Sequence, residues 1–436
     1  MDVGRHALSS VARELRHGSL ELQHPLVKDR VERALRRSID LVPAAEAVVA
    51  EVRPDLALFL ERGYTPYGEI FDVLLNAGVD TIQWFHGHRS DALAFKRYTR
   101  ETRDLHGFSL SPSTWERVRA MPWTEGRDRE VLRELRERYE SGTWFARKFA
   151  NVGKRLKTPE EVRRQLGLDP AKKTAVIFSH ILWDATFFFG ENLFEDYEEW
   201  LVETVKAACA NAAVNWVVKL HPDYVWKLKL DDAGWEIRDE IAIRAKVGAL
   251  PGHVRLLPPD TDINTFSLFP VTDYCLTVRG TIGIEMPCFG IPVLTAGTGR
   301  YSGLGFTIDS KSREEYLERL GRIQEIPRLG EEETRLARKH AYTLLKLRLC
   351  PLITFEFVQT PLETLGHPLA HDVSIRARSG RDIETAADLT AFVHWAIESR
   401  EPDFLLSLDG RGEPAAGPWG PAVGGGESAG GGGARG

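Results

Sequence analysis

The feature that most restricts the fold is the alternation of apolar and amphipathic segments between residues 172 and 365. Thr174–Ser179 (TAVIFS) is a continuous apolar run bounded by turn residues, which is typical of a strand buried on both faces of a parallel sheet. The later segment YEEWLVETVKAACANA has the spacing of an amphipathic helix. The same alternation continues, with strands expected at Asn215–Leu220, Val254–Leu256, Asp273–Val278 and Pro292–Thr295, and helices near Ile263–Phe269, Thr281–Phe289, Ser312–Ile323 and Glu331–Leu347. This pattern predicts an α/β fold built on a doubly wound parallel sheet.

The first half of the chain predicts helices and a single β-α-β unit. The first fifty residues carry apolar side chains at helical spacing with charges between them. A strand at Asp55–Leu60, a helix at Tyr67–Asn76 and a strand at Thr81–Phe85 follow. From residue 109 to 162 the chain is charged and helical, and Thr158 with Glu161 has the form of a capping box.

Length and pattern together predict two main domains. A chain of 436 residues is too long for one ordinary hydrophobic core. We expect a Rossmann-like and helical domain at 1–165, a Rossmann-like domain at 166–365, a helical appendage at 366–409 and a disordered tail at 410–436. The first domain has few strands and is expected to be an incomplete Rossmann-like half. The tail is rich in glycine and has almost no apolar side chains to bury.

The charge balance argues against a nucleic-acid-binding protein. The formal net charge is -6, and basic and acidic residues are mixed along most of the chain, whereas nucleic-acid-binding proteins concentrate lysine and arginine on one face. The sequence contains no run of about 18 apolar residues, so no transmembrane helix is predicted. The N-terminal segment also lacks the apolar stretch of a secretory signal. We therefore expect a cytoplasmic globular protein.

Cysteine and histidine spacing gives no sign of a metal site. The four cysteines are scattered, without a CxxC pair, and are expected to be small buried hydrophobic residues in a reducing compartment. His86 and His88 are two residues apart, but no third ligand stands at a recognisable spacing. No metal and no bound cofactor is predicted.

The strongest chemical signal is the segment from Cys275 to Gly297 (CLTVRGTIGIEMPCFGIPVLTAG). Its strand ends in an Arg279-Gly280-Thr281 turn at the start of a predicted helix, where free main-chain N–H groups bind anions. Gly280 permits close approach of a phosphate, and Arg279 can add a bidentate charge. Glu285, one turn into the helix, is expected to accept hydrogen bonds from ribose hydroxyls. The alternative is an ordinary β-α-β turn that binds nothing.

Two further motifs follow predicted strands of the same sheet. Lys219 and Leu220 are followed by His221-Pro222, where the proline fixes the turn and the histidine is expected to contact a phosphate or assist its departure. His180 and Asp184 lie in the loop SHILWDAT, and Asp184 among aromatic residues can serve as base or nucleophile. Because ligands of open α/β sheets bind at the carboxyl ends of strands, all three motifs are expected in one crevice. Taken singly, His221 fits a plain turn and Asp184 fits a helix cap or turn.

Polar segments also follow the strands of the first half. Glu61-Arg62-Gly63-Tyr64 follows one strand and His86-Gly87-His88-Arg89 follows the next. Lys96-Arg97-Tyr98 comes shortly after. These residues would present acceptor-binding groups across a cleft, and the alternative for each is a solvated loop.

In order along the chain, SHILWDA, KLHP, RGTIGIEMPCFGIPVLTAG and RYSGLGFT resemble the capsule polysaccharide biosynthesis family. That family includes retaining β-Kdo transferases, which have GT-B-like folds and use CMP-Kdo. The resemblance implies that His221-Pro222 faces the nucleotide phosphate and that Asp184 is a covalent nucleophile. It also implies that Glu285 and Gly290-Ile291-Pro292 form the family's E-x-x-x-x-G-x-P segment. Glu61-x-Gly63 resembles its acceptor-side segment.

The resemblance predicts a metal-independent glycosyltransferase of GT-B type, with two Rossmann-like halves facing a cleft. The predicted catalytic residues are Asp184, His221 and Glu61. The predicted nucleotide-sugar-binding residues are His180, Lys219, Pro222, Arg279, Gly280, Thr281, Glu285, Thr298 and Tyr301. Expected partners are a nucleotide sugar, CMP-linked in the family, and a glycan or glycolipid acceptor of capsule or lipopolysaccharide, with peripheral contact to the inner membrane.

Two other functions stay open at this stage. The same segment is similar to UDP-N-acetylglucosamine 2-epimerases, which also pair a His-Pro turn with a Gly-rich turn, a ribose-binding glutamate and a G-x-P-V-L segment. A non-catalytic subunit of polysaccharide assembly is the third possibility. The loop ending in Asp184 lacks the glutamine usual in the transferase family, and Arg279 stands where that family has a small hydroxyl residue. The donor sugar is therefore left open.

Overall fold

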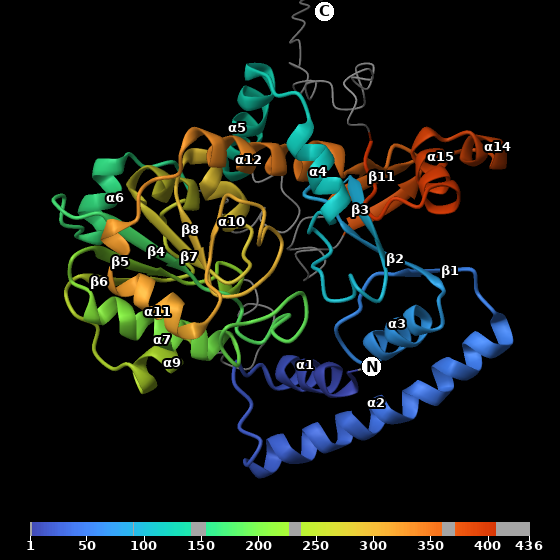
Figure 1. The fold of residues 1–436 in the computed structure, drawn as a ribbon, viewed down its shortest axis with the longest axis horizontal. Helices are drawn as coiled ribbons and strands as arrows, with labels where there is room; N and C mark the ends of the chain where they lie inside the picture. The colour runs from blue at the N-terminus through green and yellow to red at the C-terminus, as the bar shows by residue number, and fades with distance from the viewer. Residues whose placement is uncertain (1, 90, 141–153, 226–236, 360–370, 407–436) are drawn as a thin grey trace, which may run out of the picture.

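The computed structural model describes residues 2–89, 91–140, 154–225, 237–359 and 371–406. They form two α/β halves side by side, with the second half at the left of Figure 1 and the first half at the right. The tail expected at 410–436 lies outside the described residues. Among the described helices, none is both long and apolar enough to cross a membrane.

The second half is built on a six-stranded sheet with the order β6-β5-β4-β7-β8-β9. Every neighbouring pair is parallel, which confirms the predicted doubly wound arrangement. Its strands are β4 (Thr174–Phe178), β5 (Asn215–Lys219), β6 (Val254–Leu257), β7 (Tyr274–Thr277), β8 (Val293–Thr295) and β9 (Ile308–Asp309). The chain runs outward from β4 to β6, returns to β7, and then runs outward on the other side. The strand order therefore reverses between β4 and β7, which is the point where open α/β sheets bind ligands.

Two apolar layers enclose this sheet, one on each face. Ala175 and Ile177 face a cluster that contains α7 and α11, whereas Val176 and Phe178 face a second cluster on the opposite side. Because both faces of the sheet are covered at β4, the sequence of this strand is a continuous apolar run. The surrounding elements are α6 (Pro159–Leu166), α7 (Tyr197–Ala210), α9 (Arg238–Lys246), η2 (Thr265–Val271), α10 (Ile282–Glu285), η3 (Met286–Phe289), α11 (Arg313–Gly321), η4 (Ile323–Glu325), α12 (Glu331–Tyr342) and η5 (Thr343–Leu347). The capping box predicted at Thr158 and Glu161 is confirmed at the start of α6.

One regular helix was predicted over Thr281–Phe289, but the structure is less regular there. The segment consists of one short α segment, α10, followed by the 3-10 turn η3, which contains Pro287. A proline ring cannot continue the α-helical hydrogen-bond pattern. The helix dipole invoked for phosphate binding is correspondingly short.

The first half contains a four-stranded sheet with the order β1-β2-β3-β10. Its strands are β1 (Leu56–Phe59), β2 (Asp80–His86), β3 (Ala92–Tyr98) and β10 (Cys350–Pro351). Only β1 and β2 are parallel, and they form the predicted β-α-β unit with α3 (Tyr67–Asn76). The expectation of an incomplete Rossmann-like half is thus confirmed. Helices α1 (Val3–Leu15) and α2 (Pro25–Val52) run along the base of this half (Figure 1), and α4 (Pro112–Ala120) and α5 (Glu125–Glu140) pack near α12.

The C-terminal part of the chain returns to the first sheet. Strand β10 pairs with β3, and Trp395 and Phe404 pack on Ile82 and Phe95. The elements after β10 are β11 (Phe355–Gln359), β12 (His371–Ile375), α14 (Gly380–Glu384), α15 (Ala387–Val393) and η6 (His394–Glu398). The segment predicted as a helical appendage at 366–409 therefore also supplies a strand, β12, which pairs with β11.

A buried cluster of charged side chains holds this C-terminal segment against the first half. The Asp403 carboxylate lies 2.8 Å from Lys96 Nζ and 3.3 Å from the Arg348 guanidinium, and all three side chains are fully buried. Lys96 also donates to the carbonyl of Ser109 and to the hydroxyl of Ser111. Its two neighbouring cations lower the pKa of Asp403 to about 2, against the opposing effect of burial.

We predict that Asp403→Ala lowers the free energy of unfolding by about 3 kcal/mol, because it leaves two buried cations without their counter-charge. Urea denaturation measures this change. Glu401→Ala is the matched control, since Glu401 pairs with Arg117 on the surface and such pairs contribute about 1 kcal/mol or less. Equal losses in the two variants would contradict the assignment.

Candidate functional site

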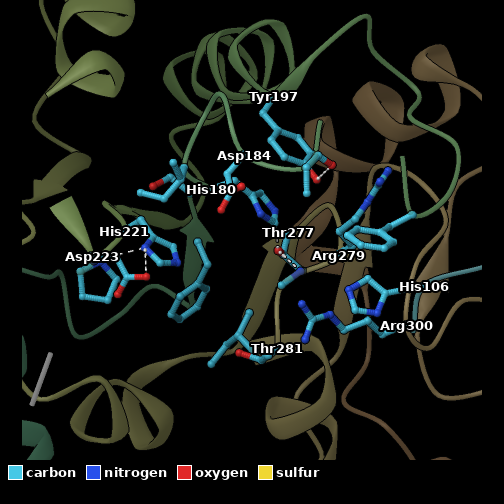
Figure 2. Close-up of a pocket in the computed structure, with 18 of the residues that line it drawn as sticks. His106, His180, Asp184, Tyr197, His221, Asp223, Thr277, Arg279, Thr281 and Arg300 are labelled. Atoms are coloured by element: carbon cyan, nitrogen blue, oxygen red, sulfur yellow. Dashed lines mark hydrogen bonds and ion pairs between the residues drawn. The ribbon is translucent and has the colours of Figure 1, made fainter. Parts of the chain in front are cut away.

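A cavity of about 370 Å³ lies where the two halves meet at the carboxyl ends of β4, β5 and β7 (Figure 2). The three motifs expected to converge are all on its wall. The second half supplies Phe178, Ser179, His180, Ile181, Asp184, Ala185, Phe188, Phe189, Tyr197, Lys219, Leu220, His221, Pro222, Asp223, Thr265, Thr277, Arg279, Gly280, Thr281, Ile282 and Arg300, and the first half supplies Glu61, Tyr64 and His106. The predicted crevice therefore exists, while the chemical roles assigned to its residues stay predictions.

Asp184 is held from the opposite half. The Tyr64 hydroxyl donates to Asp184 Oδ1 over 2.8 Å and accepts the Ala185 N–H over 3.0 Å. Burial, with the charge of Asp184, raises the pKa of Tyr64, so its hydroxyl keeps the proton that it donates. Ala185 and Phe189 have φ of 55° and 75°, which side chains rarely adopt. Such backbone strain is common in loops that position functional groups.

The three residues Glu61, Arg62 and Gly63 bring the first half against this loop. Glu61 lines the cavity, and its Oε1 accepts the main-chain N–H groups of Arg62 and Gly63 at 2.7 and 3.1 Å. A side chain at Gly63 would overlap the ring of Phe188, 2.2 Å from the added Cβ. The glycine thus permits the close contact between the two halves.

His180 is fixed as one neutral tautomer. Its Nε2 accepts the Val278 N–H over 3.2 Å and lies 3.1 Å from the Thr277 hydroxyl. That hydroxyl accepts the Gly280 N–H, so its own proton is directed to His180. The ring proton is therefore on Nδ1. Burial and the charges of His221 and Arg279 lower the pKa of His180 well below the usual range, which keeps the ring neutral.

Lys219 and His221 lie on the cavity wall at the end of β5. His221 Nδ1 accepts the Asp223 N–H over 3.2 Å, as the His-Pro turn brings the chain back on itself. Lys219 is buried, with Nζ 6.0 Å from the centre of the Phe178 ring. Thr281, which also lines the cavity, follows β7. These groups form the part of the wall that is best suited to a phosphate.

Arg279 has a packing role that the sequence did not reveal. It was expected to offer a bidentate charge to a phosphate, but it is only 4% exposed. It donates to the carbonyls of Phe188 and Glu191 at 2.9 and 3.1 Å, and also to Asn192 Oδ1. It therefore ties the Asp184 loop to the end of β7 while one side still lines the cavity.

Glu285 does not reach the cavity. Its carboxylate is fully buried, 2.6 Å from Arg138 Nη1, and accepts a hydrogen bond from Tyr139. The expected contact with ribose hydroxyls is thus corrected to a structural ion pair between α10 and the end of α5. Tyr301 and Thr298 are also absent from the described cavity wall. Tyr301 donates to the carbonyl of Gly280 and Thr298 accepts the Glu191 N–H, so both support the turns that form the wall.

Other candidates from the first half lie elsewhere. Lys96 belongs to the ion group with Asp403, and Arg97 pairs with Asp80 over 2.7 Å. Tyr98 packs beneath α3. His86 and His88 are outside the cavity lining, and no group of three or more histidine, cysteine or acidic residues in the described ranges could hold a metal ion. Cys275, Cys288 and Cys350 are buried and Cys209 is partly buried, in agreement with the expectation for the cysteines.

The polar residues of the cavity wall that were not assigned a role from the sequence include His106, Tyr197, Thr277 and Arg300. Thr277 ends β7, two residues before Arg279, and lies inside the Cys275–Gly297 motif, where only the turn and the helix were assigned roles. Tyr197 starts α7 and stacks on His180 with ring centres 4.5 Å apart. His106 and Arg300 stand in segments without a strand signal.

No protein-family model matches the chain, and no curated protein matches it in sequence. Similar solved structures include the beta Kdo 2,7 transferase of KpsC from Thermosulfurimonas dismutans, at 15% identity and a TM-score of 0.39 over 67% of this chain and 79% of that one. The beta Kdo 2,4 transferase of KpsC from the same organism has 15% identity and a TM-score of 0.35 over 65% and 78%.

A UDP-GlcNAc 2-epimerase from Neisseria meningitidis, solved with UDP-GlcNAc, has 12% identity and a TM-score of 0.33 over 78% of this chain and 93% of that one. Similarities at this level assign no function to this chain.

A buried acid supports the cavity wall from behind. Tyr224 donates to Asp239 Oδ2 over 2.5 Å, and its ring packs edge-on against Trp183, next to Asp184. Burial raises the pKa of Asp239 to about 7. Because the folded state binds this proton more tightly than the unfolded state, the stabilisation is complete below pH 3.8 and is lost as pH rises to about 7.

We predict that the wild type loses about 2 kcal/mol of unfolding free energy between pH 5 and pH 8 relative to Asp239→Asn, because the amide does not ionise. Urea denaturation at the two pH values measures the difference. Asp262→Asn, on a side chain that is 68% exposed, should follow the wild type. A constant difference between wild type and Asp239→Asn would contradict the assignment.

Proposed function

We propose that this protein is a glycosyltransferase that moves a sugar from a nucleotide-sugar donor to a glycan or glycolipid acceptor of a surface polysaccharide. The observation that supports the proposal most strongly is the convergence of three strand-end motifs on one cavity at the strand-order reversal. Such a crevice is the usual nucleotide position in open α/β sheets. The second half supplies most of the wall, and the first half closes the cavity with Glu61, Tyr64 and His106.

In this proposal the phosphates of the donor lie against Lys219, His221 and Thr281. The ammonium of Lys219 and the N–H groups near Gly280 offset the negative charge that develops on the phosphate as the nucleotide leaves. His180 presents a neutral Nδ1–H donor whose direction is fixed by Thr277 and Val278. This arrangement stabilises a departing nucleotide through side chains and main-chain groups of the protein.

Asp184 is the proposed nucleophile. One carboxylate oxygen attacks the anomeric carbon, and the bond from that carbon to the phosphate oxygen breaks with its electrons leaving on the nucleotide. The acceptor hydroxyl then attacks the anomeric carbon, the bond to Asp184 breaks with its electrons returning to the carboxylate, and the hydroxyl proton is released to water. Two successive displacements retain the anomeric configuration. Tyr64 orients the carboxylate through the 2.8 Å hydrogen bond across the cleft. On the basis of the sequence resemblance, we propose Kdo or a related sugar as the transferred group.

We predict that a CMP-, UDP-, GDP- or dTDP-linked sugar stabilises the protein, by about 2.7 kcal/mol at a hundred times its dissociation constant. A thermal-shift series with these compounds measures it. Lys219→Gln should weaken binding of the active compound, whereas Lys206→Gln, on the exposed face of α7, should not. The absence of stabilisation by every compound would contradict the proposal.

We predict that Asp184→Asn reduces transfer at least about 100-fold while changing donor affinity by only a few-fold, because the amide keeps the shape but is a poor nucleophile. Product formation with donor and glycan acceptor measures transfer. Asp260→Asn, on an exposed aspartate, is the control. Incubation with donor alone separates the rival function, since interconversion of epimers without acceptor would establish an epimerase.

A further inference from the structure

Basic side chains gather at the end of the cavity that faces the first half. His106, Arg279 and Arg300 lie together there (Figure 2). Arg62 stands behind them, with its guanidinium 4.9 Å from the centre of the Phe189 ring, which itself lies 4.6 Å from the His106 ring. Three guanidinium groups thus surround one histidine.

Two of these guanidinium groups lack a counter-charge from the described protein. Arg62 and Arg279 are each only 4% exposed. Arg62 donates to the side chain of Gln83 and to two main-chain carbonyls. Arg279 donates to two carbonyls and an asparagine side chain. Within the described ranges neither forms an ion pair with a carboxylate. Buried charges are normally paired, so the positive charges at this end of the cavity would stabilise a bound negative charge.

The carboxylates on the cavity wall do not supply that charge. Glu61 accepts two main-chain N–H groups of its own loop, and Asp184 accepts the hydroxyl of Tyr64. Asp223 lies 3.8 Å from His221, on the β5 side of the cavity. Among the described contacts, none of the three carboxylates pairs with Arg279.

The buried position of His106 and the positive charges around it keep the ring neutral, so His106 is an uncharged hydrogen-bond donor. Burial, followed by the charges of Arg300 and Arg62, lowers its pKa well below the usual range. Nδ1 accepts the Phe108 N–H over 3.0 Å, so the ring proton is on Nε2. The histidine therefore adds a hydrogen-bond donor beside the arginines without adding charge.

We propose that this end of the cavity binds an anionic group, a carboxylate or a phosphate, carried by the acceptor sugar. Arg279 and Arg300 supply the charge and His106 Nε2 supplies a hydrogen bond. Phe188 and Phe189, on the same wall, offer apolar surfaces for the sugar ring. The inference rests on the proposed function and deepens it, because it defines the acceptor as an acidic or phosphorylated saccharide.

The test is equilibrium binding of D-glucuronate, D-glucose 6-phosphate and D-glucose to the full chain without nucleotide. At least one anionic sugar should bind about tenfold more tightly than glucose, as expected for hydrogen bonds to a charged group. The preferred anion tells whether a carboxylate or a phosphate is recognised. Equal affinity for all three sugars would overturn the proposal.

Three variants locate the anion. Arg300→Gln and His106→Gln should each bring the anionic sugar close to the affinity of glucose, whereas Lys219→Gln, on the β5 side, should leave the preference intact. The opposite pattern would place the anion at the proposed nucleotide phosphate position and overturn the inference. Circular dichroism melting confirms folding, and His106→Gln carries the test if Arg300→Gln does not fold. Because no nucleotide is used, a failure here is distinct from a failure to bind nucleotide sugars.

Discussion

The structure depends on the reversal of strand order between β4 and β7. The helical elements that follow β4 and β7 pack on opposite faces of the sheet. The loops leading to them therefore diverge, and a crevice remains between them at the carboxyl end of the sheet. The loop after β4 carries His180 and Asp184, and the turn after β7 carries Arg279, Gly280 and Thr281. The turn after β5 adds His221. One topological constraint thus assembles the candidate site from segments up to about one hundred residues apart.

Contacts between the two halves close this crevice from the side of the first half. Gly63 lies against Phe188, and Tyr64 reaches Asp184, so the strained loop after β4 is held from the first half as well as by Arg279 from behind. The C-terminal segment stabilises the same region indirectly. Asp403 binds Lys96 and Arg348, and these cations hold the carbonyls of Gly107 and Ser109 next to His106. The position of the cavity wall therefore depends on residues at both ends of the described chain.

The sequence predicts much of the second half because its strands are apolar runs bounded by turns. Thr174–Phe178 and Asn215–Lys219 agree with the expected strands to within one residue. Strand β3 was missed because Lys96 and Arg97 interrupt its apolar pattern, and their burial depends on Asp403 and on Asp80. Such long-range ion pairs leave no local signal.

The candidate site was likewise predictable where its signals are local, and not where they depend on contacts between distant residues. The three turns were predictable because each follows a strand of one sheet. The roles of Arg279 and Glu285 were not, because their partners Asn192 and Arg138 lie about 90 and 150 residues away in the chain, as the residue numbers show. His106 and Arg300 reach the cavity from loops whose course is set by packing between the halves.

A crystal structure of the chain with the nucleotide sugar that stabilises it would show directly how the donor binds. We expect phosphate oxygens within hydrogen-bond distance of Thr281 and of Lys219 or His221, with the anomeric carbon facing Asp184. A nucleotide bound outside the crevice between β4 and β7, or with its sugar directed away from Asp184, would contradict this expectation.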